Sequence, residues 1–333
     1  MKDIYIADLP KHENQTIVAF FSAPSKQLRM KRGGEHYLAL VLADRTGQIE
    51  CRMWDNALAA APGFEQGDIV KVKGQVCRYQ ERLQINIELI RSALDGEYDL
   101  GDFLPKTAKD IDAMWAELTG CVDSFANLHL KALLQSFLDD PGIAPALHEA
   151  PAARKMHHAW IGGLLEHIVS LIGLCEATAR HYPEIDRDLL LSGAILHDIG
   201  KLRELRWATG FEYTPEGTLI GHITIGIGMI ETKIAAIPDF PPALRTLLLH
   251  MILSHHGKYE FGSPKLPMIP EAMLFSYLDD LDAKMQSMRS EFAKNEVLGK
   301  APGEFTDWVR ALERPLLDTA AFLSSQNGKE GKP

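Results

Sequence analysis

The sequence predicts a multidomain protein in which a small all-β barrel of the OB-fold type precedes an all-α helical bundle. Three observations lead to this prediction. They are strand-like patterning over the first ninety-odd residues, a change of hydrophobic period from two to about 3.6 near residue 107, and a length of 333 residues. With 46% hydrophobic and 24% charged residues, such a chain can bury a real core and has the composition of an ordinary soluble protein.

Five segments with β-branched or alternating residues predict the strands of the first domain, residues 1–95. Asp44-Arg-Thr-Gly47 predicts a turn between the second and third strands, and the Ala-rich stretch Asp55–Ala61 predicts a helix after the third. The predicted strands are Gln15–Phe21, Tyr37–Ala43, Gln48–Trp54, Ile69–Gln75 and Leu83–Leu89. This is the strand order of an OB-fold barrel, although a small sandwich would give the same pattern.

A linker is predicted at residues 96–106, followed by a helical domain at 107–323 and a polar, disordered tail at 324–333. Asp186 and Asp188 are helix-start signals for the segment 187–203, which contains the His197-Asp198 dipeptide. The predicted helices are 107–119, 123–139, 156–181, 187–203, 221–237, 242–256, 270–294 and 304–323.

Charge and histidine are unevenly distributed along the chain. Residues 1–95 carry 13 Lys and Arg against 12 Asp and Glu, net +1, whereas the remainder carries 22 against 33, net −11. Eleven of the thirteen histidines lie at or beyond His129, so a metal site is expected in the acidic second domain. The overall charge of −10 argues against indiscriminate coating of DNA, and the neutral first domain is where a polyanion would be tolerated.

No signal peptide or membrane span is predicted, because no apolar stretch approaches the length of about 18 residues that a span requires. The four cysteines are too far apart for a zinc knuckle or a redox pair. They predict free thiols in a reducing cytoplasm.

A series of metal-ligand side chains falls on or at the ends of apolar helical segments. Asp198 beside His197 in an apolar run would be costly to bury without a compensating charge, and a divalent metal supplies one. Lys201 shares the helix face of this dipeptide and can hold a phosphate oxygen. The other candidate ligands are His167, His222, His255, His256 and Asp279, with Asp282 an alternative to Asp279.

The order His…His-Asp…His…His-His…Asp resembles the HD phosphohydrolase superfamily in its two-metal form. Several stretches are closer to one branch, the YhaM-type 3′-to-5′ exoribonucleases, in which an OB-fold precedes the HD domain. These stretches are Gly162-Gly-Leu-Leu-Glu-His167, Ile195-Leu-His-Asp-Ile-Gly-Lys201, Gly217–His222, Ser254-His-His-Gly-Lys-Tyr-Glu-Phe-Gly-Ser-Pro264 and Leu278–Lys284. The resemblance covers nearly the full chain.

The resemblance implies one metal ion on His167, His197, Asp198 and Asp279, with Asp198 bridging to a second ion on His222, His255 and His256. It implies a water-derived nucleophile activated by the two ions, with Lys201 stabilising the phosphate oxygens. It favours Mn²⁺, while the ligand types also permit Fe, Co or Ni. Lys201-Leu202 stands where alarmone hydrolases carry Glu-Asp, and Gly262-Ser263-Pro264 where cyclic-di-GMP phosphodiesterases carry Gly-Tyr-Pro. Both activities are therefore disfavoured.

Two basic segments of the first domain predict contacts with a single-stranded nucleic acid. Lys26, Arg29, Lys31 and Arg32 lie in the stretch Pro24–Gly34, which we expect to form the loop between strands 1 and 2. Arg78, Tyr79 and Arg82 lie in the expected loop between strands 4 and 5. These are the two loops with which OB-folds commonly contact single strands, and Tyr37 and Trp54 offer stacking faces beside them.

The leading hypothesis is a cytoplasmic exonuclease that acts on single-stranded RNA, with single-stranded DNA and a homo-oligomeric state left open. The first alternative is an HD phosphohydrolase of nucleotides or cyclic dinucleotides with a regulatory OB-like domain. The second is an OB-fold adaptor with a degenerate HD domain, against which the complete ligand set speaks.

Overall fold

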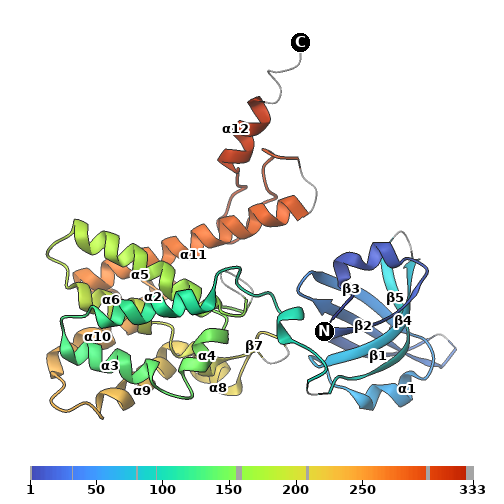
Figure 1. The fold of residues 1–333 in the computed structure, drawn as a ribbon, viewed down its shortest axis with the longest axis horizontal. Coiled ribbons are helices and arrows are strands. Elements are labelled where there is room, and N and C mark those ends of the chain that lie inside the picture. The colour runs from blue at the N-terminus through green and yellow to red at the C-terminus, as the bar shows by residue number, and fades with distance from the viewer. Residues whose placement is uncertain are drawn as a thin grey trace.

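The computed structural model describes residues 2–31, 33–79, 82–94, 96–154, 160–207, 210–297 and 301–327. In Figure 1 a five-stranded barrel (blue to cyan) lies beside a bundle of helices (green to orange), and one chain segment joins them. No helix in the described residues is long and apolar enough to cross a membrane.

The first domain is a closed barrel with strand order β1-β2-β3-β5-β4. Its strands are β1 (Thr16–Met30), β2 (His36–Asp44), β3 (Gly47–Met53), β4 (Ile69–Tyr79) and β5 (Arg82–Ser92). The parallel pair β3–β5 closes the barrel, and α1 (Ala57–Ala60) lies between β3 and β4. Alternate side chains fill the interior with an apolar cluster that includes Phe21, Leu40 and Ile85. This topology confirms the OB-fold prediction and excludes the sandwich.

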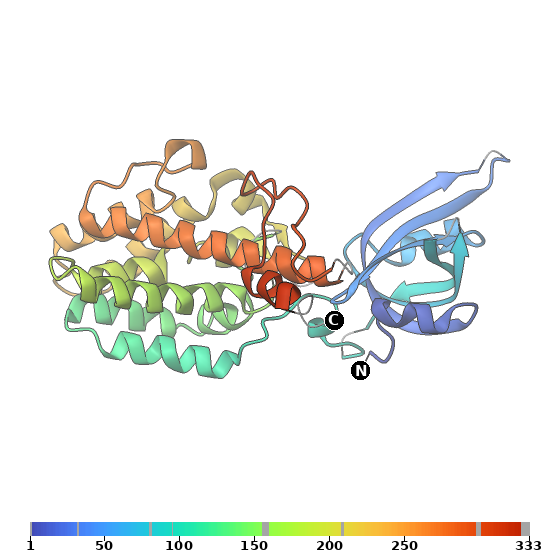
Figure 2. The same cartoon turned by 90° about the horizontal axis from the view of Figure 1, so that it is seen from above.

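The predicted loop at Pro24–Gly34 is wrong, because residues up to Met30 continue β1. The strand pairs with β4 from Thr16 to Ser22 and with β2 from Ser22 to Met30. A one-residue register shift between Ser22 and Ser25 accommodates Pro24, as expected of a proline at a β-bulge. The result is a long β1–β2 hairpin that projects beyond the rest of the barrel in Figure 2.

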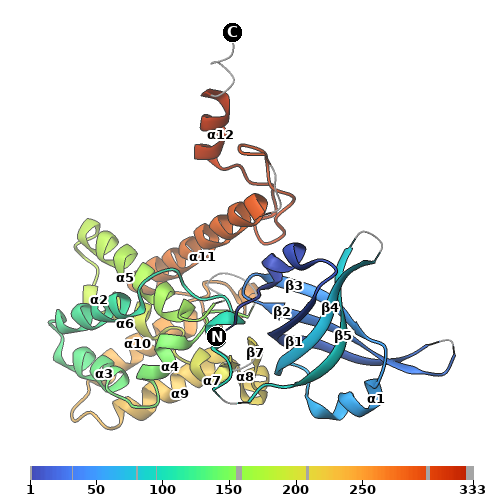
Figure 3. The same ribbon diagram turned by 45° about the vertical axis from the view of Figure 1, so that its right-hand side comes forward.

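The second domain is helical, with side-chain caps at several helix starts. Asp110, Asn127 and Asp186 accept hydrogen bonds from backbone N–H groups in the first turns of α2, α3 and α6. Its helices are α2 (Ile111–Asp123), α3 (Leu128–Leu138), α4 (Ala144–Glu149), α5 (Gly163–His181), α6 (Arg187–Leu196), α7 (Lys201–Glu204), α8 (Pro215–Ile220), α9 (His222–Ile234), α10 (Pro242–Ser254), α11 (Pro270–Val297) and α12 (Thr319–Asn327). A short hairpin, β6 (Leu205–Arg206) and β7 (Glu212–Tyr213), separates α7 from α8. Figure 3 shows α11 leaving the bundle towards α12.

Three of the predicted helices are wrong in detail. The segment 156–181 becomes helical only at Gly163, and residues 156–159 of that prediction lie outside the described residues. The segment 187–203 is two helices, because α6 ends at Leu196 and α7 begins at Lys201. The segment 304–323 is irregular up to Asp318, since Pro315 cannot continue a helix, and Asp318 then caps α12. Helix α12 also includes residues 324–327, which were predicted to be disordered, and 328–333 lie outside the described residues.

The linker predicted at residues 96–106 is ordered at both of its ends. Near the barrel, the Tyr5 hydroxyl donates a 2.5 Å hydrogen bond to Asp102, while Phe103 is buried. At the helical domain, the Thr107 hydroxyl donates to the Glu166 carboxylate over 2.7 Å. Because Glu166 precedes His167, this second anchor fixes the start of α5 next to a candidate ligand.

The turn between α6 and α7 lies directly against the start of α9. A Cβ atom on Gly200 would stand 2.0 Å from the backbone oxygen of His222 and 2.7 Å from the nitrogen of Gly226. Only glycine permits this approach, which brings Asp198 and His222 together.

Replacement of Gly200 by alanine should therefore lower the free energy of unfolding by about 3 kcal/mol or more, because two backbones would have to separate. Gly173→Ala is the matched control, since its Cβ in α5 would meet no atom within 4 Å. The control should be neutral or stabilising by about 0.5–1 kcal/mol. Chemical denaturation of both variants measures the difference, and equal stabilities would contradict the account.

Candidate metal centre

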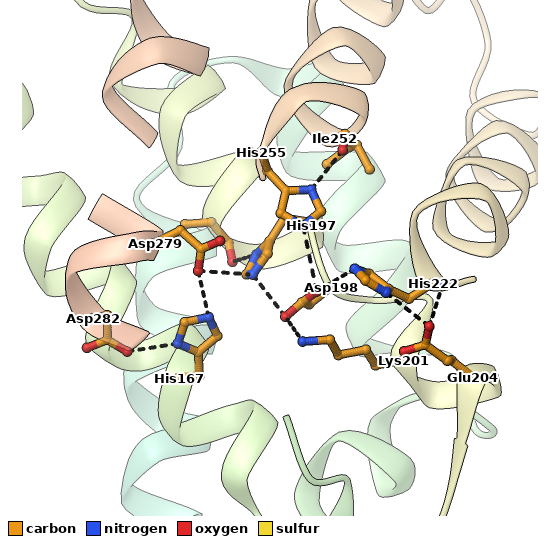
Figure 4. A network of polar contacts seen from close by, with 11 residues as sticks. His167, His197, Asp198, Lys201, Glu204, His222, Ile252, His255, Asp279 and Asp282 are labelled. Carbon is orange, nitrogen blue, oxygen red and sulfur yellow. Dashed lines mark hydrogen bonds and ion pairs between the residues drawn. The ribbon is translucent and has the colours of Figure 1, made fainter. Parts of the chain in front are cut away.

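The candidate ligands lie in or next to five helices of the second domain and meet at one place. Figure 4 labels all of them except His256. His167 lies in α5, His197 caps the C-terminal end of α6, and Asp198 follows in the turn. His222 is the first residue of α9. Two adjacent histidines, His255 and His256, follow α10, and Asp279 lies in α11.

The side chains form two groups on either side of Asp198. Ligand atoms of His167, His197 and Asp279 lie within 4.8 Å of one another, and so do those of His222, His255 and His256. Asp198 Oδ2 lies 3.1 Å from His197 Nε2 in the first group. Its Oδ1 lies 3.4 Å from His222 Nε2 and 3.9 Å from His255 Nε2 in the second. One carboxylate thus contacts both groups.

Each of the five histidines has its Nδ1 in contact with an oxygen atom outside the centre. For His197, His255 and His256 the oxygens are the backbone carbonyls of Ala194, Ile252 and Phe261, at 3.1, 2.8 and 2.8 Å. With Nδ1–H donating outward, Nε2 of each of these three histidines keeps a lone pair that is directed to the centre.

Carboxylates take the place of the carbonyls behind the other two histidines. Asp282 Oδ2 lies 2.8 Å from Nδ1 of His167, and Glu204 Oε1 lies 3.1 Å from Nδ1 of His222. Asp282 also accepts a 2.5 Å hydrogen bond from Ser170. Asp279, 3.1 Å from His167 Nε2, is therefore in the ligand position, and Asp282 stands behind the ring. Sequence reasoning did not identify Glu204; its only signal was a carboxylate three residues after Lys201.

The donor set fits divalent metal ions. Nε2 of His197, His222 and His255 and Oδ1 of Asp198 are buried and make no hydrogen bond within the described residues. Buried polar atoms without a partner are rare, and here they converge. Imidazole nitrogen and carboxylate oxygen are ligands of Mn, Fe, Co, Ni and Zn ions. These four buried atoms are therefore arranged as a divalent cation would require.

The electrostatics favour the metal-binding protonation states. Burial, together with the positive charges of neighbouring histidines, holds the pKa of His255 well below its usual range and lowers that of His256. Burial opposes the ionisation of Asp198, but His197 and Lys201 outweigh it and hold its pKa well below the usual range. Neutral imidazoles and an ionised carboxylate are the forms that bind metal.

His167 differs from these histidines. Burial would lower its pKa, but its contacts with the carboxylates of Asp279 and Asp282 outweigh burial and raise the pKa to about 9. A metal ion on Nε2 of His167 must therefore displace a proton.

The centre opens to solvent through a cavity of about 420 Å³. Lys201 lies on its wall, with Nζ 2.6 Å from Asp198 Oδ2. The remaining lining residues are Asp198, His255, His256, Phe261, Ser276, Asp279, Asp280 and Ala283. A phosphate group that enters this cavity meets the two donor groups and an ammonium at once.

Only some of the candidate RNA-binding residues lie close to one another in the structure. Lys26 donates to the backbone oxygens of Ala61, over 2.6 Å, and Phe64, so its charge is used by the segment between β3 and β4. Arg29 lies exposed on β1 and bonds to Gln27, and Arg32 lies outside the described residues. Lys31 lies 5.4 Å from the Trp54 ring, which stacks on Tyr37 at 4.8 Å.

A groove of about 740 Å³ brings the other candidates together at the side of the barrel. Tyr79 and Arg82 line it together with Arg52 and Trp54. Tyr79 is 63% exposed and Trp54 41% exposed, so both rings can meet a ligand. Arg78 is paired with Glu13 at 3.0 Å and is not among the lining residues. The groove therefore combines exposed aromatic faces with two arginines, of which Arg52 is paired with the lining residue Glu50 at 3.0 Å.

Comparisons with known proteins agree with both domains. Residues 164–284 match the model of the HD domain, and residues 25–92 match that of an OB-fold nucleic acid binding domain. Among solved structures, the second OB-fold domain of replication protein A from Methanococcus maripaludis covers 26% of this chain and 91% of its own, with 21% identity and a TM-score of 0.21. A putative aspartyl-tRNA synthetase from Leishmania major Friedlin covers 72% of this chain and 55% of its own, at 12% identity and a TM-score of 0.24. Scores this low do not establish a shared fold.

One relative matches most of this chain in sequence. The protein named 3′-5′ exoribonuclease YhaM from Geobacillus sp. (strain WCH70) is 38% identical over 292 residues, which are 87% of this chain and 88% of that protein. The match spans both the barrel and the metal centre. The chain therefore belongs to the YhaM 3′-5′ exoribonuclease family.

Proposed function

We propose that this protein is a metal-dependent exonuclease that degrades single-stranded RNA from the 3′ end. The observation that carries the proposal is the convergence of two ligand groups on the single carboxylate of Asp198. Two adjacent divalent ions are a recurrent solution for phosphodiester hydrolysis, and the relative's name supplies the RNA substrate and the polarity.

One ion is assigned to His167, His197, Asp198 and Asp279. The other is assigned to His222, His255 and His256, with Asp198 shared. Mn²⁺ is the proposed metal, by resemblance to the family, and Fe, Co and Ni remain compatible with these ligands. When bound, the pair of ions supplies an activated water and neutralises charge on the phosphodiester.

The residues of the chain position the reaction. The outward Nδ1 bonds hold the five rings in fixed orientations, so the donor atoms need no rearrangement when substrate binds. Lys201 is near enough to exchange its contact with Asp198 for a non-bridging phosphate oxygen, which it would stabilise as negative charge develops. No side chain has to act as a nucleophile.

In this proposal the barrel binds the single-stranded RNA. Trp54 and Tyr79 would stack on bases, while Arg52 and Arg82 in the same groove contact the backbone. Lys31 and Arg29 extend this surface along the β1–β2 hairpin. Stacking and phosphate contacts do not read sequence, which suits an enzyme that removes nucleotides in succession.

The direct test gives the purified protein with Mn²⁺ two single-stranded RNAs, one labelled at its 5′ end and one at its 3′ end. Loss of the 3′ label as a mononucleotide, with stepwise shortening of the 5′-labelled strand, is the expected result. Single-stranded DNA and a panel of nucleotides and cyclic dinucleotides are assayed in parallel. Hydrolysis of nucleotides without any attack on RNA would overturn the proposal in favour of a nucleotide phosphohydrolase.

Asp198→Asn should abolish turnover while leaving the fold largely intact, because the amide keeps the shape of the carboxylate but loses the charge that both metal groups share. Asp280→Asn is the control on the same cavity wall, since Asp280 pairs with Lys284 at 2.5 Å instead of facing the donor groups. RNA hydrolysis rates and thermal unfolding are measured for both. Near-normal activity of metal-saturated Asp198→Asn would remove Asp198 from the mechanism.

Glu204→Gln should weaken metal binding about 10- to 100-fold, because an amide holds Nδ1 of His222 less strongly than a carboxylate does. Glu260→Gln, on an exposed turn, is the comparison variant and should bind metal as the native protein does. Metal titration by calorimetry gives the affinities. If Glu204→Gln bound both ions at native affinity, the carboxylate would have only a structural role.

Changing Arg29 and Lys31 together to serine should weaken RNA binding and reduce its salt dependence. Each lost phosphate contact should lower the slope of log K against log salt by about 0.7. Lys26→Ser is expected to affect barrel stability more than the slope, because its ammonium is bonded to backbone oxygens of the segment between β3 and β4. An unchanged slope for the double variant would show that the hairpin charges face only solvent.

A further inference from the structure

One aromatic side chain at the metal cavity has no role in the chemistry described above. Phe261 lines the same cavity as Asp198, Lys201 and His256. Its side chain is apolar, whereas the side chains of those three residues are polar or charged. It belongs to the stretch Gly257–Pro264, which follows the paired histidines, and ends the 3-10 turn η4 (Tyr259–Phe261). The metal chemistry proposed above does not require an apolar aromatic side chain at this position.

The turn that carries Phe261 is fixed by several hydrogen bonds. Its backbone oxygen accepts the 2.8 Å bond from Nδ1 of His256, and its nitrogen donates to Lys258. Glycines with positive φ at 257 and 262 permit the tight path on either side, and Ser263 ties the turn to the end of α10. The position of Phe261 is therefore coupled to the position of a metal-ligand candidate.

The ring itself is 57% exposed. A large apolar side chain on a firmly held turn gains little stability from such exposure, so packing does not account for it. The Lys258 ammonium lies 5.2 Å from the ring centroid and is its cationic neighbour. The rest of the ring surface is available to a flat ligand at the cavity mouth.

We propose that Phe261 is the stacking platform for the base of the 3′-terminal nucleotide, whose phosphate lies at the metal groups. This inference rests on the proposed function and deepens it, because it assigns the base subsite. A nucleotide that fits places its phosphate by Asp198 and Lys201 and its base over Phe261, all within one cavity of about 420 Å³. Every base has a π face, so the subsite tolerates any sequence while it requires a base.

The test compares 5′-AMP with ribose 5-phosphate, which lacks the base, by calorimetry on the full-length protein loaded with Mn²⁺. The native protein should bind 5′-AMP at least about fivefold more tightly, the lower limit for one base stacked on an aromatic ring. Phe261→Leu should remove this preference while leaving the affinity for ribose 5-phosphate unchanged. Phe261→Trp should keep or increase it.

Phe305→Leu is the control, since Phe305 is 58% exposed but lies in the segment before α12, away from the cavity-lining residues. It should retain the native preference. Equal binding of the two ligands by the native protein, or a full preference in Phe261→Leu, would overturn the inference. The native protein and Phe261→Trp decide the question even if Phe261→Leu does not fold.

A second measurement separates this inference from the proposed function. RNA with an abasic 3′-terminal residue should show a raised KM with the native protein, and Phe261→Leu should show the same KM for abasic and intact RNA. If the native protein hydrolysed no RNA, the nuclease proposal would fail while the 5′-AMP preference could still hold. If RNA were degraded but the preference were absent, only the base subsite would fall.

Discussion

The helical domain is organised around one buried carboxylate, that of Asp198. A charge in this position is costly unless neighbouring cations and hydrogen bonds compensate it. Here Lys201 lies 2.6 Å away, and histidines from three helices surround it. The close packing of Gly200 on α9 then follows as a requirement, because it brings His222 to the carboxylate. The fold around the centre therefore brings His197, His222 and His255, which lie at the ends of three helices, to the two oxygens of one carboxylate.

The ends of α6 and α10 orient the imidazole rings of His197 and His255 through backbone carbonyls. The last carbonyls of a helix have no partner within the helix. His197 and His255 each use such a carbonyl, three residues earlier, as the acceptor for Nδ1. His222, at a helix start, has no such carbonyl and is backed by Glu204 instead. His167, in the interior of α5, is backed by Asp282 for the same reason. For these four histidines the position relative to the helix thus determines which group accepts from Nδ1.

The strand order and the helical second domain could be predicted because they rest on alternation and periodicity, and the candidate ligands could be named because their order along the chain resembles that of a known family. The acidic residues that contact Nδ1 of the histidine rings could not be predicted. Glu204 and Asp282 are ordinary acidic residues in the sequence, and only the folded chain shows which ring each one contacts. Pro24 suggested a loop where a bulge continues β1, and the helical pattern before α12 concealed the effect of Pro315. Lys26 illustrates a further limit, since its ammonium is bonded to the backbone of the segment between β3 and β4.

The central claim is that Asp198 joins two metal ions in one centre. Two Mn²⁺ ions bridged in this way would lie about 3.5–4 Å apart and would be magnetically coupled. Electron paramagnetic resonance during Mn²⁺ titration tests this directly. The account predicts that two ions bind per chain and that the six-line signal of isolated Mn²⁺ gives way to the broad spectrum of a coupled pair. Saturation at one ion, or two ions that keep the isolated signal, would contradict it.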